Sequence, residues 1–252
     1  MKSYLLAFTL ILSGAVYSSL AAQSAPAANR KVRPDASAAT EKTDATGKFQ
    51  KMHASFLERG KAGPMGVLFL GDSITEGWKG ASEVWDQSFG KYQPANFGIG
   101  GDQTQHVIWR IENGELDGIK PRVVVLMLGT NNTGANTAEE IAAADTKIVS
   151  LIRKKLPQSK VLLLAVFPRG PRKSATGTDD GVERMKIIRT VNSKLAKLDD
   201  GRTVRFLDLG PKFLDGSGAI PMSIMPDQLH LSPAGYKIWA EAMMPLLQEM
   251  MR

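Results

Sequence analysis

The chain has 252 residues, of which 43% are hydrophobic and 23% are charged, and its formal net charge is +7. This composition is ordinary for a soluble globular protein, and the length is enough for one domain with a substantial core. The absence of cysteine excludes disulfides and a lipid-modified cysteine anchor. Basic residues do not cluster with aromatic ones, so we do not predict nucleic-acid binding.

The N-terminal residues have the pattern of a secretory signal peptide. Lys2 is followed by an apolar stretch from Tyr4 to Leu12 and by small residues around Ala21, and we expect a signal peptide over residues 1–22. An uncleaved membrane anchor is the alternative, although the apolar stretch is short for a transmembrane span. We therefore expect a secreted or periplasmic protein without stable membrane insertion after cleavage.

Residues 23–48 are rich in Ala, Ser, Thr and Pro and have no apolar periodicity. Such a segment cannot bury enough surface to offset its ordering entropy, so we expect a disordered linker there. The folded domain is expected over residues 49–252.

Within that domain, apolar segments alternate with helical patterns. The expected strands are 66–70, 95–98, 122–128, 160–167 and 204–209. The expected helices are 49–59, 82–89, 105–112, 138–155, 182–198 and 231–251. Strands that are apolar on both faces and alternate with helices predict an α/β protein, a three-layer α/β/α sandwich with a central parallel sheet.

Polar clusters follow three of the expected strands. They are Gly71-Asp72-Ser73, Gly100-Gly101-Asp102 and Gly129-Thr130-Asn131-Asn132. Each could be only a turn with a helix cap, because Ser and Asp are favoured there. The carboxyl ends of parallel strands lie at one edge of the sheet, where ligands bind, so the three clusters are expected to converge.

A serine in such a cluster needs a base to act as a nucleophile. His53 lies in the first expected helix and His106 beside the apolar face of another, and a structural role is favoured for both. His230 lies in a loop three residues after Asp227, whose carboxylate could orient the ring and leave the other nitrogen for Ser73. Many Asp-x-x-His pairs are only capping contacts.

The same clusters offer donors for an oxyanion. Gly101 can bring its backbone N–H close to a ligand, Asn131 carries a side-chain amide, and the N–H of Ser73 lies near a helix start. Three donors directed at one point would stabilise a tetrahedral oxyanion.

Four short blocks resemble those of the SGNH (GDSL-type) hydrolases, in the same order. They are GDSIT at 71–75, NFGIGGD at 96–102, GTNN at 129–132 and DQLH at 227–230. The sequence is most similar to the platelet-activating factor acetylhydrolase catalytic-subunit subgroup, from about Met52 to near the C-terminus. The N-terminal 48 residues and the loop 169–181 depart from that subgroup.

The resemblance implies a flavodoxin-like SGNH hydrolase fold, with Ser73 as nucleophile, His230 as base and Asp227 as its partner. It implies oxyanion donors at Ser73, Gly101 and Asn131. Asp72 and Asp102 would brace loops rather than react.

By the same resemblance, Ile74, Thr130 and Leu229 would contact the acyl group and favour a short one such as acetyl. The expected function is a serine esterase that deacetylates carbohydrates or other small esters. A phospholipid acetylhydrolase or lysophospholipase is an alternative within the same class.

A non-catalytic glycan-binding module is the alternative of another class, but it would be expected to lack Ser73, His230 or Asn131, and all three are present. The chain has no GxSxG, HExxH or cysteine cluster, so we expect neither an ordinary α/β-hydrolase nor a metal site, and no cofactor. A small-molecule or glycan ester is the expected ligand, and a homodimer is possible.

Overall fold

The computed structural model describes residues 33–174, 177–178 and 181–252. The expected signal peptide lies outside these residues. Within the described part of the chain, no helix is long and apolar enough to cross a membrane.

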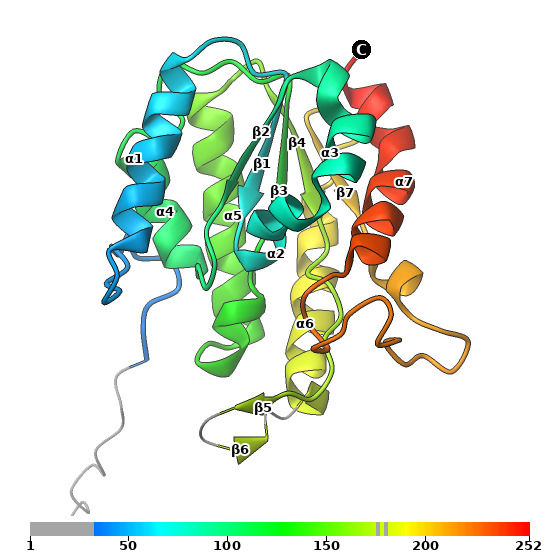
Figure 1. Cartoon of the computed structure of the whole chain (residues 1–252). Helices are drawn as coiled ribbons and strands as arrows, with labels where there is room; N and C mark the ends of the chain where they lie inside the picture. The colour runs from blue at the N-terminus through cyan, green and yellow to red at the C-terminus, as the bar shows by residue number, and fades with distance from the viewer. Residues whose placement is uncertain (1–32, 175–176, 179–180) are drawn as a thin grey trace, which may run out of the picture. The chain divides into compact units, whose positions relative to one another are not determined.

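A five-stranded sheet forms the centre of the domain (Figure 1). Its strands, in spatial order, are β2 (Pro94–Gly98), β1 (Val67–Gly71), β3 (Val123–Met127), β4 (Lys160–Leu164) and β7 (Val204–Leu207). All four pairings are parallel. Every residue of β1 and β3 is buried, as expected for strands that are covered on both faces.

Helices cover both faces of this sheet. The α-helices are α1 (Lys48–Lys61), α2 (Ser73–Glu76), α3 (Ser82–Phe89), α4 (Thr104–Glu112), α5 (Ala138–Lys155), α6 (Gly181–Leu195) and α7 (Pro233–Met250). Short 3-10 helices cover Gly77–Ala81, Gly90–Tyr92, Thr130–Gly134, Ala196–Leu198 and Gly210–Phe213. Two-residue strands, β5 (Lys173–Ser174) and β6 (Gly177–Thr178), pair antiparallel away from the main sheet.

The two hydrophobic clusters show which helices share a face. Leu68 and Leu70 of β1 pack with apolar residues of α1, α4, α5 and α6. Val67 and Phe69 of the same strand point the other way and pack with α3 and α7, where Trp239 is fully buried. Successive side chains of a strand alternate between faces, so one apolar run supplies both cores. The expected three-layer sandwich with a parallel sheet is confirmed.

The prediction of a disordered linker over residues 23–48 is wrong for its described part, residues 33–48. Ala36 is buried, and its carbonyl accepts a hydrogen bond of 2.8 Å from Thr104 Oγ1. The carboxylate of Asp44 accepts backbone N–H groups at the start of α1. The segment is held mainly by polar contacts to distant residues, which composition and apolar periodicity do not reveal.

Candidate active site

The first polar cluster forms a sharp turn between β1 and α2. Asp72 is the N-cap of α2, and its Oδ1 accepts a hydrogen bond of 2.9 Å from the N–H of Ile74. Burial raises the pKa of Asp72 to about 7, although the Ile74 N–H favours the charged form. Ser73 follows as the first residue of the helix, where a backbone N–H has no acceptor within the helix. The turn therefore leaves the N–H of Ser73 available to a ligand.

Ser73 lies at one end of a chain of hydrogen bonds. Its Oγ is 2.9 Å from Nε2 of His230, and Nδ1 of His230 is 2.7 Å from Oδ2 of Asp227. With the proton on Nδ1, the ring donates to the carboxylate and accepts from the hydroxyl of Ser73. The structure thus brings together the three residues that the sequence singled out, in the expected order.

Hydrogen bonds within the loop before α7 fix the backbone around His230. Oδ1 of Asp227 accepts the backbone N–H groups of Leu229 at 3.1 Å and His230 at 2.7 Å. Gln228, between Asp227 and Leu229, has a φ of 61°, an uncommon left-handed conformation for a residue other than glycine. The carbonyl of Gln228 in turn accepts the N–H of Gly170 at 2.8 Å. These bonds join the histidine loop to the segment that follows β4.

The charge of Asp227 is shared between two donors. Besides His230, the guanidinium of Arg172 lies 2.7 Å from Oδ2. Burial opposes the charge, but the hydrogen bonds from His230 and the nearby Arg172 outweigh it and lower the pKa of Asp227. The carboxylate is therefore ionised at neutral pH and able to hold the histidine ring.

The other two histidines have structural partners. The Nδ1 of His106 accepts the backbone N–H of Gln103 at 3.0 Å and completes the cap of α4. Burial, with the cations of Lys42 and Arg110 nearby, lowers the pKa of His106 to about 4, so its ring is neutral at pH 7. His53 is buried in α1, where its Nδ1 lies 3.3 Å from Glu115.

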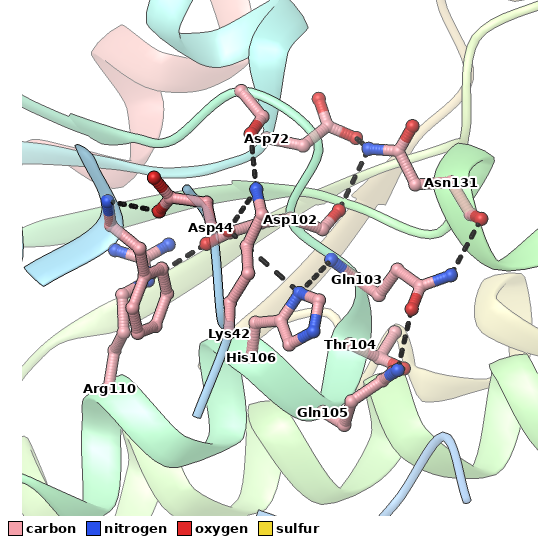
Figure 2. A network of polar contacts seen from close by, with 12 residues as sticks. Lys42, Asp44, Asp72, Asp102, Gln103, Thr104, Gln105, His106, Arg110 and Asn131 are labelled. Atoms are coloured by element: carbon pink, nitrogen blue, oxygen red, sulfur yellow. Dashed lines mark hydrogen bonds and ion pairs between the residues drawn. The ribbon is translucent and has the colours of Figure 1, made fainter. Parts of the chain in front are cut away.

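Two of the three expected oxyanion donors come from the loops after β2 and β3, Gly101 from the first and Asn131 from the second, and Figure 2 shows Asn131. Gly101 has a φ of 75°, which favours glycine. Nδ2 of Asn131 donates to the carbonyl of Asp102 at 2.8 Å and lies 3.4 Å from Oδ2 of Asp72. The first bond is short and the second is long, so the weaker contact to Asp72 is the one that a ligand oxygen could replace.

Glu76 connects helix α2, which carries Ser73, to the loop after β2. Its carboxylate accepts the N–H of Gly100 at 2.7 Å and pairs with Lys48 at 2.8 Å. A β-carbon added to Gly100 would lie 3.8 Å from the β-carbon of Ser73. The loop after β2 and Ser73 are therefore neighbours in space.

A buried charged network supports that loop (Figure 2). Asp102 lies 3.0 Å from Nε of Arg110 and 3.4 Å from the ammonium of Lys42. Arg110 also pairs with Glu115 at 2.6 Å. Burial raises the pKa of Asp102 to about 6, although the two cations favour its charged form.

Another buried carboxyl, that of Asp145, lies next to the loop after β3. A β-carbon added to Gly129 would lie 3.4 Å from Oδ2 of Asp145, a fully buried residue of α5. Neither of its carboxyl oxygens meets a hydrogen-bond donor among the residues that the structure describes. Burial and the nearby Asp72 raise the pKa of Asp145, so its neutral form is favoured.

The three residues expected around the acyl group are all buried. Ile74 is 1%, Thr130 0% and Leu229 3% exposed, and Ile74 and Leu229 belong to one hydrophobic cluster. They therefore offer almost no free surface here, and contact with an acyl group stays a prediction from the resemblance.

Sequence reasoning missed three residues of the site. Glu76 follows Ser73 by three positions, but its partners Gly100 and Lys48 are distant in the sequence, so local spacing does not indicate them. Lys42 and Arg172 lie in segments without periodic structure, and their partners are distant in the sequence. Among the described residues, no cluster of three or more histidine or acidic side chains could hold a metal ion.

A hydrogen-bonded serine, histidine and carboxylate at the rim of an α/β sandwich are typical of serine hydrolases. The chain belongs to the GDSL-like lipase/acylhydrolase family, whose model matches residues 69–238. It is an acylhydrolase, and the resemblance seen in the four sequence blocks is confirmed.

Two relatives are similar over most of their length. The platelet-activating factor acetylhydrolase IB subunit alpha1 of Bos taurus is 37% identical over 201 residues, which are 80% of this chain and 83% of that protein. The alpha2 subunit of Rattus norvegicus is 37% identical over 215 residues, or 84% and 90%. A GDSL-like lipase structure from Bacteroides thetaiotaomicron shares the fold, with a TM-score of 0.63 and 18% identity over 78% of this chain and 97% of that one.

Proposed function

We propose that the protein hydrolyses short-chain carboxylic esters, above all acetyl esters, with Ser73 as nucleophile. The observation that carries this proposal is the hydrogen-bonded sequence from Ser73 through His230 to Asp227. A serine hydroxyl becomes a nucleophile when a base accepts its proton as it attacks. His230 is placed to accept that proton, and Asp227 stabilises the resulting imidazolium.

The reaction has two halves. Oγ of Ser73 bonds to the acyl carbon while its proton passes to Nε2 of His230, and the carbonyl oxygen becomes an oxyanion. Collapse of this intermediate breaks the ester C–O bond, and His230 gives the proton to the departing alcohol. Water then attacks the acyl-serine by the same route, releasing the carboxylic acid and restoring the hydroxyl of Ser73.

The oxyanion would be held by the backbone N–H groups of Ser73 and Gly101 and by the amide of Asn131. Such donors act most strongly when they are fixed before the reaction begins. The bond of Asn131 to the carbonyl of Asp102 and the bond of Gly100 to Glu76 support a fixed arrangement.

The acyl group is proposed to be small. The relatives at 37% identity carry the name acetylhydrolase, which supports acetyl esters for this chain. Ile74, Thr130 and Leu229 would bound the acyl site and are closely packed, so a long acyl chain would require them to move.

For the alcohol half, we propose acetylated carbohydrates or other small esters, because the signal-like N-terminus supports export to a place where acetylated glycans occur. The name platelet-activating factor acetylhydrolase of the relatives favours an acetylated phospholipid as the second candidate. Release of acetate from an acetylated monosaccharide and from a 2-acetyl-glycerophospholipid, compared side by side, separates the two.

The central experiment replaces the nucleophile. Ser73→Ala should lower kcat on p-nitrophenyl acetate by several orders of magnitude and leave the circular dichroism spectrum unchanged. Ser150→Ala is a matched control, since Ser150 is an exposed residue of α5 whose hydroxyl donates only to Thr146 in its own helix. Activity of the Ser73 variant within about tenfold of wild type would mean that another residue is the nucleophile.

A further inference from the structure

Lys42 reaches the candidate active site from outside the part of the chain that the family model matches. That match covers residues 69–238, whereas Lys42 lies in the segment before α1. Its ammonium donates a 2.5 Å hydrogen bond to the carbonyl of Gly100 and lies 3.4 Å from Oδ1 of Asp102. Figure 2 shows the Lys42 side chain between these partners, and the side chain is only 20% exposed.

The carbonyl that Lys42 binds belongs to the peptide group that also contains the N–H of Gly101, a proposed oxyanion donor. The C=O of Gly100 and the N–H of Gly101 are parts of the same planar unit, and the chain has no cis peptide bond among its described residues. In a trans peptide the C=O and the N–H point in opposite directions. An ammonium on the oxygen therefore fixes where the N–H of Gly101 points, and its charge polarises that N–H as a donor.

We propose that Lys42 is a positioning residue for the oxyanion donor of Gly101, an inference that rests on the proposed esterase function. Without Lys42, the peptide between two glycines could rotate easily, because glycine tolerates many backbone conformations. Glu76 holds the N–H of Gly100, which belongs to the preceding peptide. Lys42 is thus the contact that acts on the peptide of the donor itself.

The position of Gly101 also fits this role. A β-carbon added there would lie 3.1 Å from the ammonium of Lys42, and the φ of 75° disfavours any other residue. The same loop carries the carbonyl of Asp102, which accepts the amide of Asn131. Lys42 therefore contacts the same short loop that contains the N–H of Gly101 and holds the amide of Asn131.

The segment that carries Lys42 is anchored on both sides. The N–H of Thr40 donates to the carbonyl of Gln105 at 3.1 Å, and Asp44 caps α1. Further upstream, Lys147 of α5 donates to the carbonyl of Ser37 at 2.9 Å. Because the backbone is fixed by other contacts, the binding of the loop costs only the rotamer entropy of the lysine side chain and no further ordering of the backbone.

The test compares Lys42→Met with wild type on p-nitrophenyl acetate. We expect kcat to fall about tenfold or more with little change in KM, because a donor that acts in the transition state is disturbed. The rate of covalent inactivation by a fluorophosphonate, read as a mass shift on Ser73, should fall in parallel. The phosphoryl oxygen of the inhibitor would accept hydrogen bonds from the same donors as the oxyanion, so this measurement does not depend on the natural substrate.

Lys147→Met is the matched control. It removes a lysine that binds the same segment at Ser37 without touching the oxyanion loop, so kcat should stay at the wild-type value. A loss of equal size in both variants would mean that general loosening of the segment, not Lys42, is responsible, and would overturn the inference.

Chemical rescue gives a second readout. The chain has no cysteine, so Lys42→Cys introduces a single thiol, and 2-bromoethylamine converts it to a side chain that ends in an amine near the original position. We expect low kcat before this treatment and recovery after it. Failure to recover in folded protein, or wild-type kcat in Lys42→Met, overturns the inference. The proposed function fails separately, if Ser73→Ala retains activity.

Discussion

Each residue of Gly71-Asp72-Ser73 meets a different physical demand. A β-carbon added to Gly71 would lie 2.2 Å from Oγ1 of Thr75 and 2.5 Å from the carbonyl oxygen of Met127, so only glycine fits there. Asp72 caps the helix that follows, and Ser73 faces His230. The turn and cap interpretation and the nucleophile interpretation are therefore compatible, because neighbouring residues carry them.

Two histidine variants separate the proposed base from the helix cap. His230→Ala should lower kcat/KM by at least about a thousandfold, because Ser73 loses its proton acceptor. The side chain of His230 is 41% exposed, so the melting temperature should change little. His106→Ala should keep most of kcat but lose about 1 kcal/mol of stability, because a cap of α4 is removed.

The two variants are compared on the same short-chain ester at pH 7, with circular dichroism as the folding check. His106 is neutral at that pH, since its pKa is lowered to about 4. An inactive but folded His106→Ala protein would show that the roles of the two histidines are reversed.

At the scale of elements, the close contact between β2 and α2 sets the position of the site. A β-carbon added to Gly98 of β2 would lie 2.2 Å from the N of Glu76. Gly98→Ala should therefore lower the free energy of unfolding by about 1–3 kcal/mol, the usual range for an overpacked site. Urea unfolding measures this loss.

Gly80→Ala is the control for that prediction. A β-carbon at Gly80 would meet no atom within 4 Å, and its φ is not in the left-handed region. The urea unfolding midpoint of Gly80→Ala should stay close to that of wild type. Equal effects of the two substitutions would show that close packing between β2 and α2 is not the cause.

Elements with a clear apolar pattern could be predicted from the sequence, and the one-turn helix α2 could not. Helix α5 begins and ends where predicted, because an amphipathic pattern follows the capping box of Thr137 and Glu140. Helix α2 has only four residues, too few for periodicity. It depends on tertiary contacts, among them the hydroxyl of Tyr236, which donates to the carbonyl of Ile74 at 2.7 Å.

Some residues of the candidate site could also be predicted from the sequence, and others could not. The serine, histidine and aspartate could be predicted because the chain has few histidines and because four blocks carry a family pattern. Lys42 could not, since its main partner is a backbone carbonyl 58 positions away. A sequence shows side chains and local spacing, whereas this contact depends on where the backbone of another loop runs.

For the whole molecule, buried acids link stability to pH. Burial raises the pKa of Asp72 to about 7 and that of Asp102 to about 6, and it also raises the pKa of Asp145. Between about pH 4 and 7 the folded state holds protons on these groups that the unfolded chain releases. The free energy of unfolding should therefore fall as pH rises through this window. His106 acts in the opposite direction up to about pH 6.5, but it contributes only one proton.

Asp145→Asn tests this linkage. The variant keeps the shape of the side chain but cannot ionise, so it should be more stable than wild type at about pH 7.5 and similar at about pH 4. One proton corresponds to about 1.4 kcal/mol for each pH unit within the window. Urea midpoints at the two pH values give the comparison, and an equal difference at both would contradict it.

The bond between Ser73 and His230 joins positions 157 residues apart. Contacts of such long sequence separation require a large loop to close, which is slow when a parallel sheet must form in between. Neither half of the chain alone contains both partners, so the proposed catalysis requires the loop before the C-terminal helix to reach a sheet that begins near residue 67. Recovered activity during refolding is therefore expected to report one of the last events, after most helical signal has returned.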